Sequence, residues 1–414
     1  MNKLHDIIVI GAGIVGLSIA LKLQGAGRAV TVIDRKGVAA EASKNNAGAF
    51  AFADIVPLAT PGIMQRAPKW LLDPLGPLSI PPSYAFKIAP WMLRFWRASW
   101  RDRYQTSLVA QAQLMKLSQV ALERQIKTVD GEHMMRREGQ LQLYEGASEF
   151  KASLPGWSLR SEHGVEFDLL ESPDAIAEIQ PGLATRFTHA SYTPKWMNTC
   201  DPAHWTNHIA QSFIYSGGTI KIDEIKGLSQ KQDWIELATA GNEMRAKQVV
   251  VATGAWSHHL AKTLGDKIPL ETERGYNTTL PAGAFDLRTH LTFGNHGFVV
   301  SKIADGIRVG GAVELGGLNL PPNYKRSEIL LQKAVRFLPK LKIEDGQQWM
   351  GFRPSMPDSL PVIDRSPKAH NVIYAFGHGH LGLTQAAGTA EIIASLVNKI
   401  KPAIPLDAFS ADRF

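Results

Sequence analysis

The sequence predicts an α/β protein: a Rossmann-type domain with a parallel sheet, interleaved with a second, α+β domain whose sheet is mainly antiparallel. The first observation is the β-branched run Ile7–Ile10, which has the composition of a buried parallel strand. A glycine-rich turn, a segment with helical periodicity and a second strand at residues 29–33 follow, completing a β-turn-α-β unit. Further strands are expected at residues 248–252 and 372–376, so the first domain is built from distant parts of the chain.

The domain boundaries follow from the positions of these strands. We place the first domain at residues 1–50, 197–270 and 347–414, and the second domain at residues 51–196 and 271–346. The elements expected in the second domain are a mostly helical stretch over residues 91–127, strands at residues 138–144 and 272–280, and a hairpin over residues 297–313.

Composition excludes several classes of protein. The 414 residues are 44% apolar and 20% charged, an ordinary globular balance. The single cysteine, Cys200, excludes an intramolecular disulfide and a cysteine cluster for metal, and we predict no metal site. The net charge of +7 is spread along the chain without a long basic run, so we expect a solvated basic surface and no nucleic-acid partner. No apolar stretch reaches the ~20 residues that span a bilayer, and we expect a cytoplasmic protein.

The glycine-rich turn is the strongest motif. Gly11, Ala12, Gly13, Ile14, Val15 and Gly16 match G-x-G-x-x-G between a predicted strand and a predicted helix. The first glycine permits a tight turn, the second lets the backbone approach a pyrophosphate, and the third allows close packing of helix on strand. Asp34, at the end of the next strand, is expected to accept hydrogen bonds from ribose hydroxyls, which disfavours a 2′-phosphate and hence NADP. This unit alone does not decide between FAD and NAD.

Five further segments identify a family. They are Glu41–Gly48, Val250–Trp256, Gly275-Tyr276, Gly351–Asp358 and Gly377–Thr384. Together they resemble the D-amino-acid oxidase-like family of FAD flavoproteins, and most of all its bacterial D-amino-acid dehydrogenase branch, essentially from end to end. The resemblance implies non-covalent FAD, a small amino or imino acid substrate such as D-proline or hydroxy-D-proline, and a quinone-type electron acceptor.

The resemblance also assigns cofactor contacts. Besides the glycine motif and Asp34, the expected FAD-binding residues are Arg35, Ser43, Asn45, Asn46, Ala47, Gly48, Ile225, Thr253, Gly254, Gly377, Gly379, Leu381, Gly382, Leu383 and Thr384. The alternative for Ser43 is a helix cap. Cys200 does not lie in a segment associated with covalent flavin attachment. Met356, His380 and Leu383 differ from the commonest residues of the branch, so the identity of the amino acid stays open.

The chemistry predicts a small set of substrate-binding residues. Arg353 is the candidate for the substrate carboxylate, because a guanidinium can bind it with two parallel hydrogen bonds; the alternative is a structural pair with Asp358 or Asp364. The turn before the C-terminal helix directs a helix N-terminus at the flavin, where negative charge develops on reduction. His378 and His380 either add to this effect or act on the substrate, or they merely pack. Tyr276 either hydrogen-bonds the carboxylate or is a cross-strand aromatic.

Other functions stay open at this point. A glycine or sarcosine oxidase that uses oxygen differs only in its pocket and its oxygen reactivity. An RNA-modification-linked flavoprotein and a non-catalytic flavin subunit are further alternatives. The helix predicted near residues 91–104 interleaves tryptophans with arginines, which fits either a half-buried helix or peripheral contact with the inner face of the cell membrane.

Overall fold

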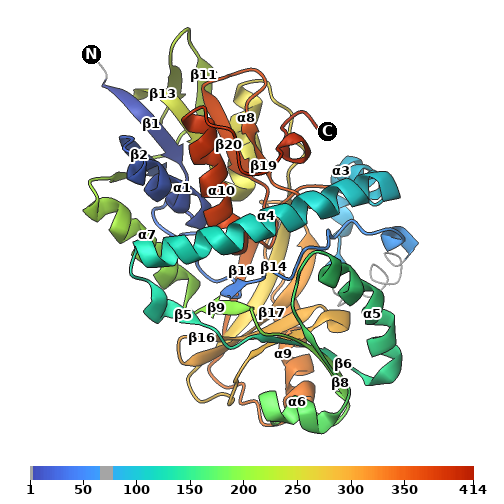
Figure 1. The fold of residues 1–414 in the computed structure, drawn as a ribbon. Helices are drawn as coiled ribbons and strands as arrows, with labels where there is room; N and C mark the ends of the chain where they lie inside the picture. Colours follow the sequence, from blue (N-terminus) through green and yellow to red (C-terminus); the bar gives the residue numbers. More distant parts are fainter. Residues whose placement is uncertain (1–2, 66–77) are drawn as a thin grey trace.

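Two large sheets make up the fold of the computed structural model, which describes residues 3–65 and 78–414 (Figure 1). The first sheet has eight strands and the second has nine. Figure 1 shows the first sheet, with β1 and β20, in the upper half and the second, with β6 and β8, in the lower half. The long helix α4 (Arg101–Thr128) crosses the middle of the view. The predicted fold class is confirmed.

The first sheet is built around a parallel core, as predicted. Strand β1 (Leu4–Ile10) pairs in parallel with β2 (Val30–Asp34) on one side and β13 (Glu243–Val251) on the other. The other parallel strands are β10 (Thr219–Ile222) and β20 (Val372–Phe376). The antiparallel strands are β11 (Gly227–Gln230), β12 (Ile235–Ala238) and β19 (Val362–Arg365).

Both faces of this sheet are covered, which explains the unbroken apolar run of β1. Ile7 and Val9 contribute to one hydrophobic cluster, and Ile8 and Ile10 contribute to another on the opposite face. The helices that contribute buried residues to these clusters are α1 (Ile14–Gly25), α4, α7 (Pro202–Tyr215), α8 (Ser257–Thr263) and α10 (Gly382–Val397).

The second sheet is mainly antiparallel. Its strands in spatial order are β18 (Gln347–Ser355), β14 (Glu271–Leu280), β17 (Gly306–Leu315), β16 (Phe298–Ile303), β15 (His290–Phe293), β6 (Gln140–Tyr144), β8 (His189–Thr193) and β7 (Asp168–Leu170). β4 (Leu78–Ser79) adds to β17, and the β15–β6 and β17–β4 pairs are the parallel ones. The predicted hairpin over residues 297–313 is confirmed as β16 and β17.

Smaller elements surround these sheets. A third sheet joins β3 (Ala49–Phe50), β9 (Met197–Thr199) and β5 (Met135–Arg136). The remaining helices are α3 (Ala85–Ala98), α5 (Gly146–Glu162), α6 (Pro173–Ile179) and α9 (Lys325–Phe337). Short 3₁₀ helices lie at Pro82–Tyr84, Glu132–Met134, Gly254–Trp256, Gly294–His296 and Asp407–Phe409.

Two predicted elements differ from the structure. The helical stretch over residues 91–127 is two helices, α3 and α4, because Trp100 takes an extended conformation between them. Strand β18, which the boundary at residue 347 assigns to the first domain, pairs with β14 in the second sheet. The division into domains at the other boundaries stays a prediction.

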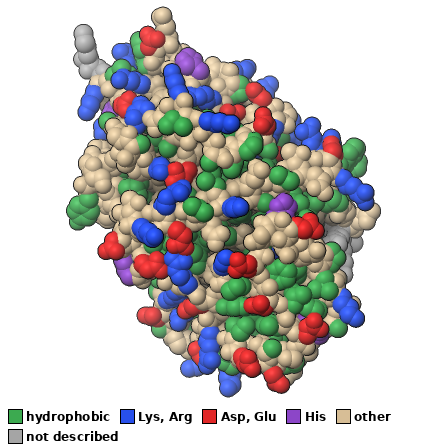
Figure 2. Space-filling model, viewed as in Figure 1, with side chains coloured by type: hydrophobic (Ala, Val, Ile, Leu, Met, Phe, Trp, Pro, Cys, Tyr) green, Lys and Arg blue, Asp and Glu red, His purple; other side chains and the backbone are tan. Residues whose placement is uncertain are grey.

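The surface agrees with the expected scatter of charge. Figure 2 shows basic and acidic side chains interspersed over the visible face, without a continuous basic patch. Within the described part of the chain, no helix combines the length and apolarity needed to cross a membrane.

Candidate active site

A cavity of about 920 Å³ lies where the carboxyl ends of the parallel strands meet the second sheet. Its volume falls within the range of ~300–1,000 Å³ that is typical of ligand sites. The predicted site residues line it except for five that lie behind its wall: Ala12, Gly16, Gly48, Gly377 and Thr384. Segments 300 residues apart in sequence therefore converge on one space.

The glycine motif has the geometry of a phosphate site. Gly11 has a φ of +114°, and a Cβ there would lie 2.3 Å from the carbonyl oxygen of Ala252. A Cβ on Gly16 would lie 2.0 Å from the carbonyl oxygen of Gly11, so helix α1 packs directly on the turn. The first turn of α1 carries no acidic residue. Its amide groups and the positive end of its dipole can therefore hold an anion.

Ser43 is placed at this helix N-terminus. Its hydroxyl accepts a hydrogen bond of 2.9 Å from the N–H of Ile14, and it also lines the cavity. The two interpretations of Ser43, a helix cap and an FAD contact, are compatible. Ser43 caps α1, a helix distant in sequence, and its own hydroxyl hydrogen remains available to a phosphate.

Asp34 holds the backbone around the site. Its carboxylate accepts hydrogen bonds from the N–H groups of Ala12 at 2.9 Å, Lys36 at 2.8 Å and Gly37 at 3.0 Å. The neighbouring Arg35 stacks on Trp256 at 3.9 Å and pairs with Glu41 at 2.9 Å. Asp34 therefore fixes the turn as well as lining the cavity.

Residues 45–48 are clamped by the second sheet. Asn277 donates to the carbonyl oxygen of Asn45 at 2.8 Å, and Arg308 donates to that of Asn46 at 2.6 Å. The side chain of Asn46 in turn accepts the N–H of Gly48 at 2.9 Å. Thr384 faces away from the cavity and accepts the N–H of Ala51 at 3.0 Å.

Arg308 is a cavity residue that the sequence analysis missed. Burial lowers its pKa to about 10, and besides Asn46 it donates to the hydroxyl of Thr279 at 2.9 Å. Its signal in the sequence is an arginine near the start of a strand that, apart from Glu314, consists of apolar residues and glycines. Four buried polar atoms of other cavity residues have no partner among the described residues: Trp196 Nε1, Asn277 Oδ1, His290 Nε2 and Ser301 Oγ. Such atoms fit a polar ligand.

Arg353 projects from β18 into the same cavity. Its guanidinium covers Gly275, where a Cβ would lie 2.4 Å from Nη2, and Nη1 donates to the carbonyl oxygen of Ala312 at 3.3 Å. No described carboxylate lies within ion-pair distance of it. The two partners considered from the sequence are engaged elsewhere: Asp358 with Arg413 at 2.7 Å, and Asp364 with the Ser410 hydroxyl at 2.8 Å.

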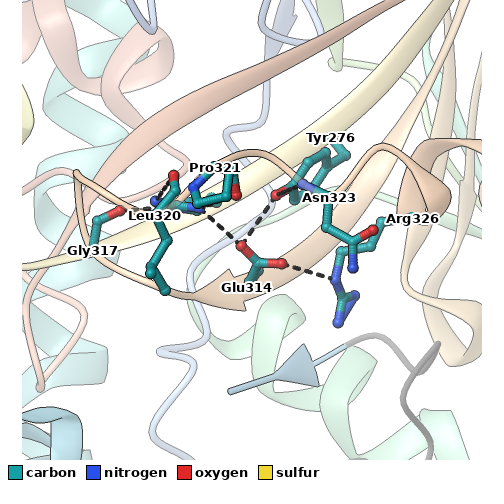
Figure 3. Close-up of polar contacts among 8 residues, drawn as sticks. Tyr276, Glu314, Gly317, Leu320, Pro321, Asn323 and Arg326 are labelled. Atoms are coloured by element: carbon teal, nitrogen blue, oxygen red, sulfur yellow. Dashed lines mark hydrogen bonds and ion pairs between the residues drawn. The ribbon is translucent and has the colours of Figure 1, made fainter. Parts of the chain in front are cut away.

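The prediction for Tyr276 is corrected by its hydrogen-bond partners. Its hydroxyl donates to Glu314 at 3.1 Å and accepts the N–H of Asn323 at 3.0 Å, in the network of Figure 3. Glu314 also binds the buried Arg274 at 3.1 Å and lies 3.5 Å from Arg326. The hydroxyl is thus committed to a buried network, which contradicts the predicted contact with the substrate carboxylate.

The two histidines of the C-terminal turn differ. His378 is buried and bonded to the Thr389 hydroxyl at 3.0 Å, and burial lowers its pKa to about 3, so it is neutral. It therefore adds no positive charge to the turn. His380 is half-exposed, with Nε2 3.7 Å from Asp54. Burial acts to raise the pKa of Asp54, but His380 and Arg160 outweigh it and the pKa is lowered.

Glu273 is a second residue that the sequence analysis missed. It is 5% exposed, lines the cavity, and lies directly across from Arg353 in the pairing of β14 with β18. The alternating charges of Glu271–Arg274 gave no sign of which carboxylate faces the cavity.

The chain was compared with known proteins. It matches the family described as FAD dependent oxidoreductase (DAO) over residues 6–396. It is 32% identical over 422 residues to a D-amino-acid oxidase of Bradyrhizobium diazoefficiens, which covers 100% of both chains. It is 30% identical over 421 residues to a D-amino acid dehydrogenase of Rhizobium johnstonii, which covers 99% of each. The solved glycine oxidase of Geobacillus kaustophilus has a TM-score of 0.78 at 19% identity, over 99% of each chain, and therefore shares the fold.

Proposed function

Because the chain belongs to the DAO family of FAD-dependent oxidoreductases, we propose that it oxidises the α-carbon of a D-amino acid or of a cyclic imino acid such as D-proline or hydroxy-D-proline. The names of its relatives support the substrate class. The observation that carries the proposal is Arg353, a half-buried guanidinium that faces the cavity with no carboxylate partner among the described residues. Such a group is suited to a substrate carboxylate.

FAD fits the rest of the cavity. The N-terminus of α1 and the turn at Gly11 and Gly13 would hold the diphosphate, and Asp34 the ribose. Residues 45–47 and Arg308 would contact the flavin, and the N-terminus of α10 would stabilise the negative charge that reduction adds. The bound flavin supplies the acceptor for the two electrons removed from the substrate. Cys200 is not among the residues lining the cavity, which supports non-covalent binding.

The role of this chain is then binding and orientation. Arg353 would hold the carboxylate with two parallel hydrogen bonds and so fix the position of the α-carbon. Gly275 leaves the space in which the guanidinium lies, and the Ala312 carbonyl oxygen orients it. Ala312 itself has a φ of +55°, unusual for a residue with a Cβ, and this conformation is part of the support for Arg353.

For the acceptor we propose a quinone reached at a membrane surface. Helix α3 exposes Phe86, Leu93 and Trp96, and it carries Lys87 and Arg94 with no acidic residue along its length. An amphipathic basic helix with exposed aromatic residues binds anionic interfaces. Binding to vesicles with anionic lipids, but not to neutral ones, in a sedimentation assay supports this placement; equal absence from both pellets contradicts it.

Turnover assays test the main proposal. We expect the purified yellow protein to reduce an artificial dye with one or more D-amino or cyclic imino acids, to be slow with L-amino acids, and to release little hydrogen peroxide in air. Rapid peroxide release with glycine or sarcosine would instead assign the oxidase alternative. No dye reduction and no peroxide with any of these compounds would contradict the proposal.

A further inference from the structure

Glu273 and Arg353 present opposite charges to the same face of the cavity. They are directly paired in the register of β14 with β18, so their side chains leave the sheet on one side. The side chain of Arg274, between Glu273 and Gly275, goes to the other face and joins Glu314. The Arg353 guanidinium leans over Gly275, and no ion pair within 4.0 Å joins it to Glu273 in the described structure. A gap therefore separates the two charges.

The environment of Glu273 differs from that of the other buried carboxylates. Glu314 binds two arginines, and Asp266 accepts hydrogen bonds from Ser366 and Tyr374. Glu271, two residues before Glu273 on the same strand, accepts from the Tyr84 hydroxyl. Within the described chain, no hydrogen bond or ion pair satisfies the Glu273 carboxylate, although the residue is only 5% exposed. The Glu273 carboxylate therefore faces the cavity without a protein partner, and a cationic ligand in the cavity would supply one.

We propose that Glu273 binds the substrate ammonium group, so that Glu273 and Arg353 together recognise an amino acid as a zwitterion. This inference rests on the proposed function and adds a specificity-determining residue to it. An α-amino acid carries its two charges on one carbon, and the separated pair in the cavity has the complementary charges on one sheet face. Glu273 then favours amino and imino acids over 2-hydroxy acids and N-acylated amino acids, which lack the cation.

The test compares two ligands that differ only in the ammonium group. D-alanine is used as the trial substrate, and propionate, which has the same carbon chain without the ammonium group, is used as the trial competitive inhibitor. With Glu273→Gln we expect the KM of D-alanine to rise about 10- to 100-fold, the effect of losing a charge-assisted hydrogen bond. We expect propionate to bind at least threefold more tightly, because a negative charge near its carboxylate is removed.

Controls separate this role from a structural one. Glu273→Asp keeps the charge and should leave propionate inhibition near the wild-type value, while restoring part of the affinity for D-alanine. Glu271→Gln removes a carboxylate on the same strand outside the cavity and should change neither ligand. The flavin absorption spectrum checks that each variant is folded and loaded.

The outcomes are distinguishable. Opposite shifts for the two ligands support the proposal. If the wild-type protein oxidises amino acids but Glu273→Gln moves both ligands in the same direction, or neither, the role of Glu273 is contradicted and the proposed function stands. If the wild-type protein oxidises no amino or imino acid, both are contradicted.

Discussion

Substituting Gly275 by alanine tests whether the position of Arg353 controls the reaction. A Cβ on Gly275 would lie 2.4 Å from Nη2 and 2.5 Å from Cζ of Arg353, whereas ordinary contact begins near 3.4 Å. The guanidinium must therefore move by about 1 Å. The arginine is flexible and Gly275 does not have a positive φ, so the fold should tolerate the change. A displacement of this size typically costs about 100-fold in rate.

The assay is steady-state dye reduction at full FAD occupancy, checked by the flavin spectrum and by thermal unfolding. We expect kcat/KM to fall about 100-fold with the melting temperature nearly unchanged. Gly241→Ala is the matched control, because a Cβ there meets no atom within 4 Å, and it should leave kcat/KM unaltered. If Gly275→Ala kept kcat/KM within about threefold of wild type, the placement of the Arg353 guanidinium would not limit turnover, and the reasoning would fail.

Three further predictions follow from the site. Arg353→Ala should lower kcat/KM by about thirty-fold to several thousand-fold, because removing one partner of a buried charge pair costs about 2–5 kcal/mol. Arg353→Lys should recover only part of the lost kcat/KM. If kcat/KM of Arg353→Ala were unchanged, the substrate carboxylate would bind elsewhere. Asp34→Ala should weaken FAD binding at least about tenfold in a fluorescence titration of the apoprotein, because charge-assisted hydrogen bonds are lost; full occupancy without added FAD would count against it. Burial lowers the pKa of His290 from 6.5 to about 4. As the pH falls, His290 is therefore protonated at a higher pH in the unfolded protein than in the folded protein. The free energy of unfolding should then drop by about 2 kcal/mol between pH 7 and pH 5 from this group, and denaturant titrations of His290→Gln should show a smaller drop.

Local signals in the sequence were sufficient for the parallel core and the glycine-rich turn. The β-branched runs of β1 and β13 had to be buried on both faces, and they are neighbours in the sheet. Two of the three glycines of the turn have a steric reason, which the structure shows as clashes of 2.3 Å at Gly11 and 2.0 Å at Gly16. These features depend on a few consecutive residues, so a local sequence pattern is enough to predict them.

The side of the cavity lined by Glu273 and Arg353 depends on long-range register, which no local pattern reports. Glu273 faces the cavity because β14 pairs with β18, about 80 residues later in the chain. A β-bulge between Arg274 and Tyr276 disturbs the pairing of β14 with β17, and the Tyr276 hydroxyl lies in the Glu314 network. Alternation along one strand could not distinguish these orientations.

The most direct measurement of the central claim is anaerobic mixing of the purified protein with D-alanine or D-proline, followed by visible absorption. Without oxygen or dye, electrons from the substrate remain on the bound flavin. The account predicts that the yellow absorption bleaches with at least one D-amino or cyclic imino acid, far faster than with the L-enantiomer, and that Arg353→Ala, with the same initial spectrum, bleaches at least thirty-fold more slowly. An unbleached flavin with every such compound, or equal bleaching rates for wild type and Arg353→Ala, would contradict it.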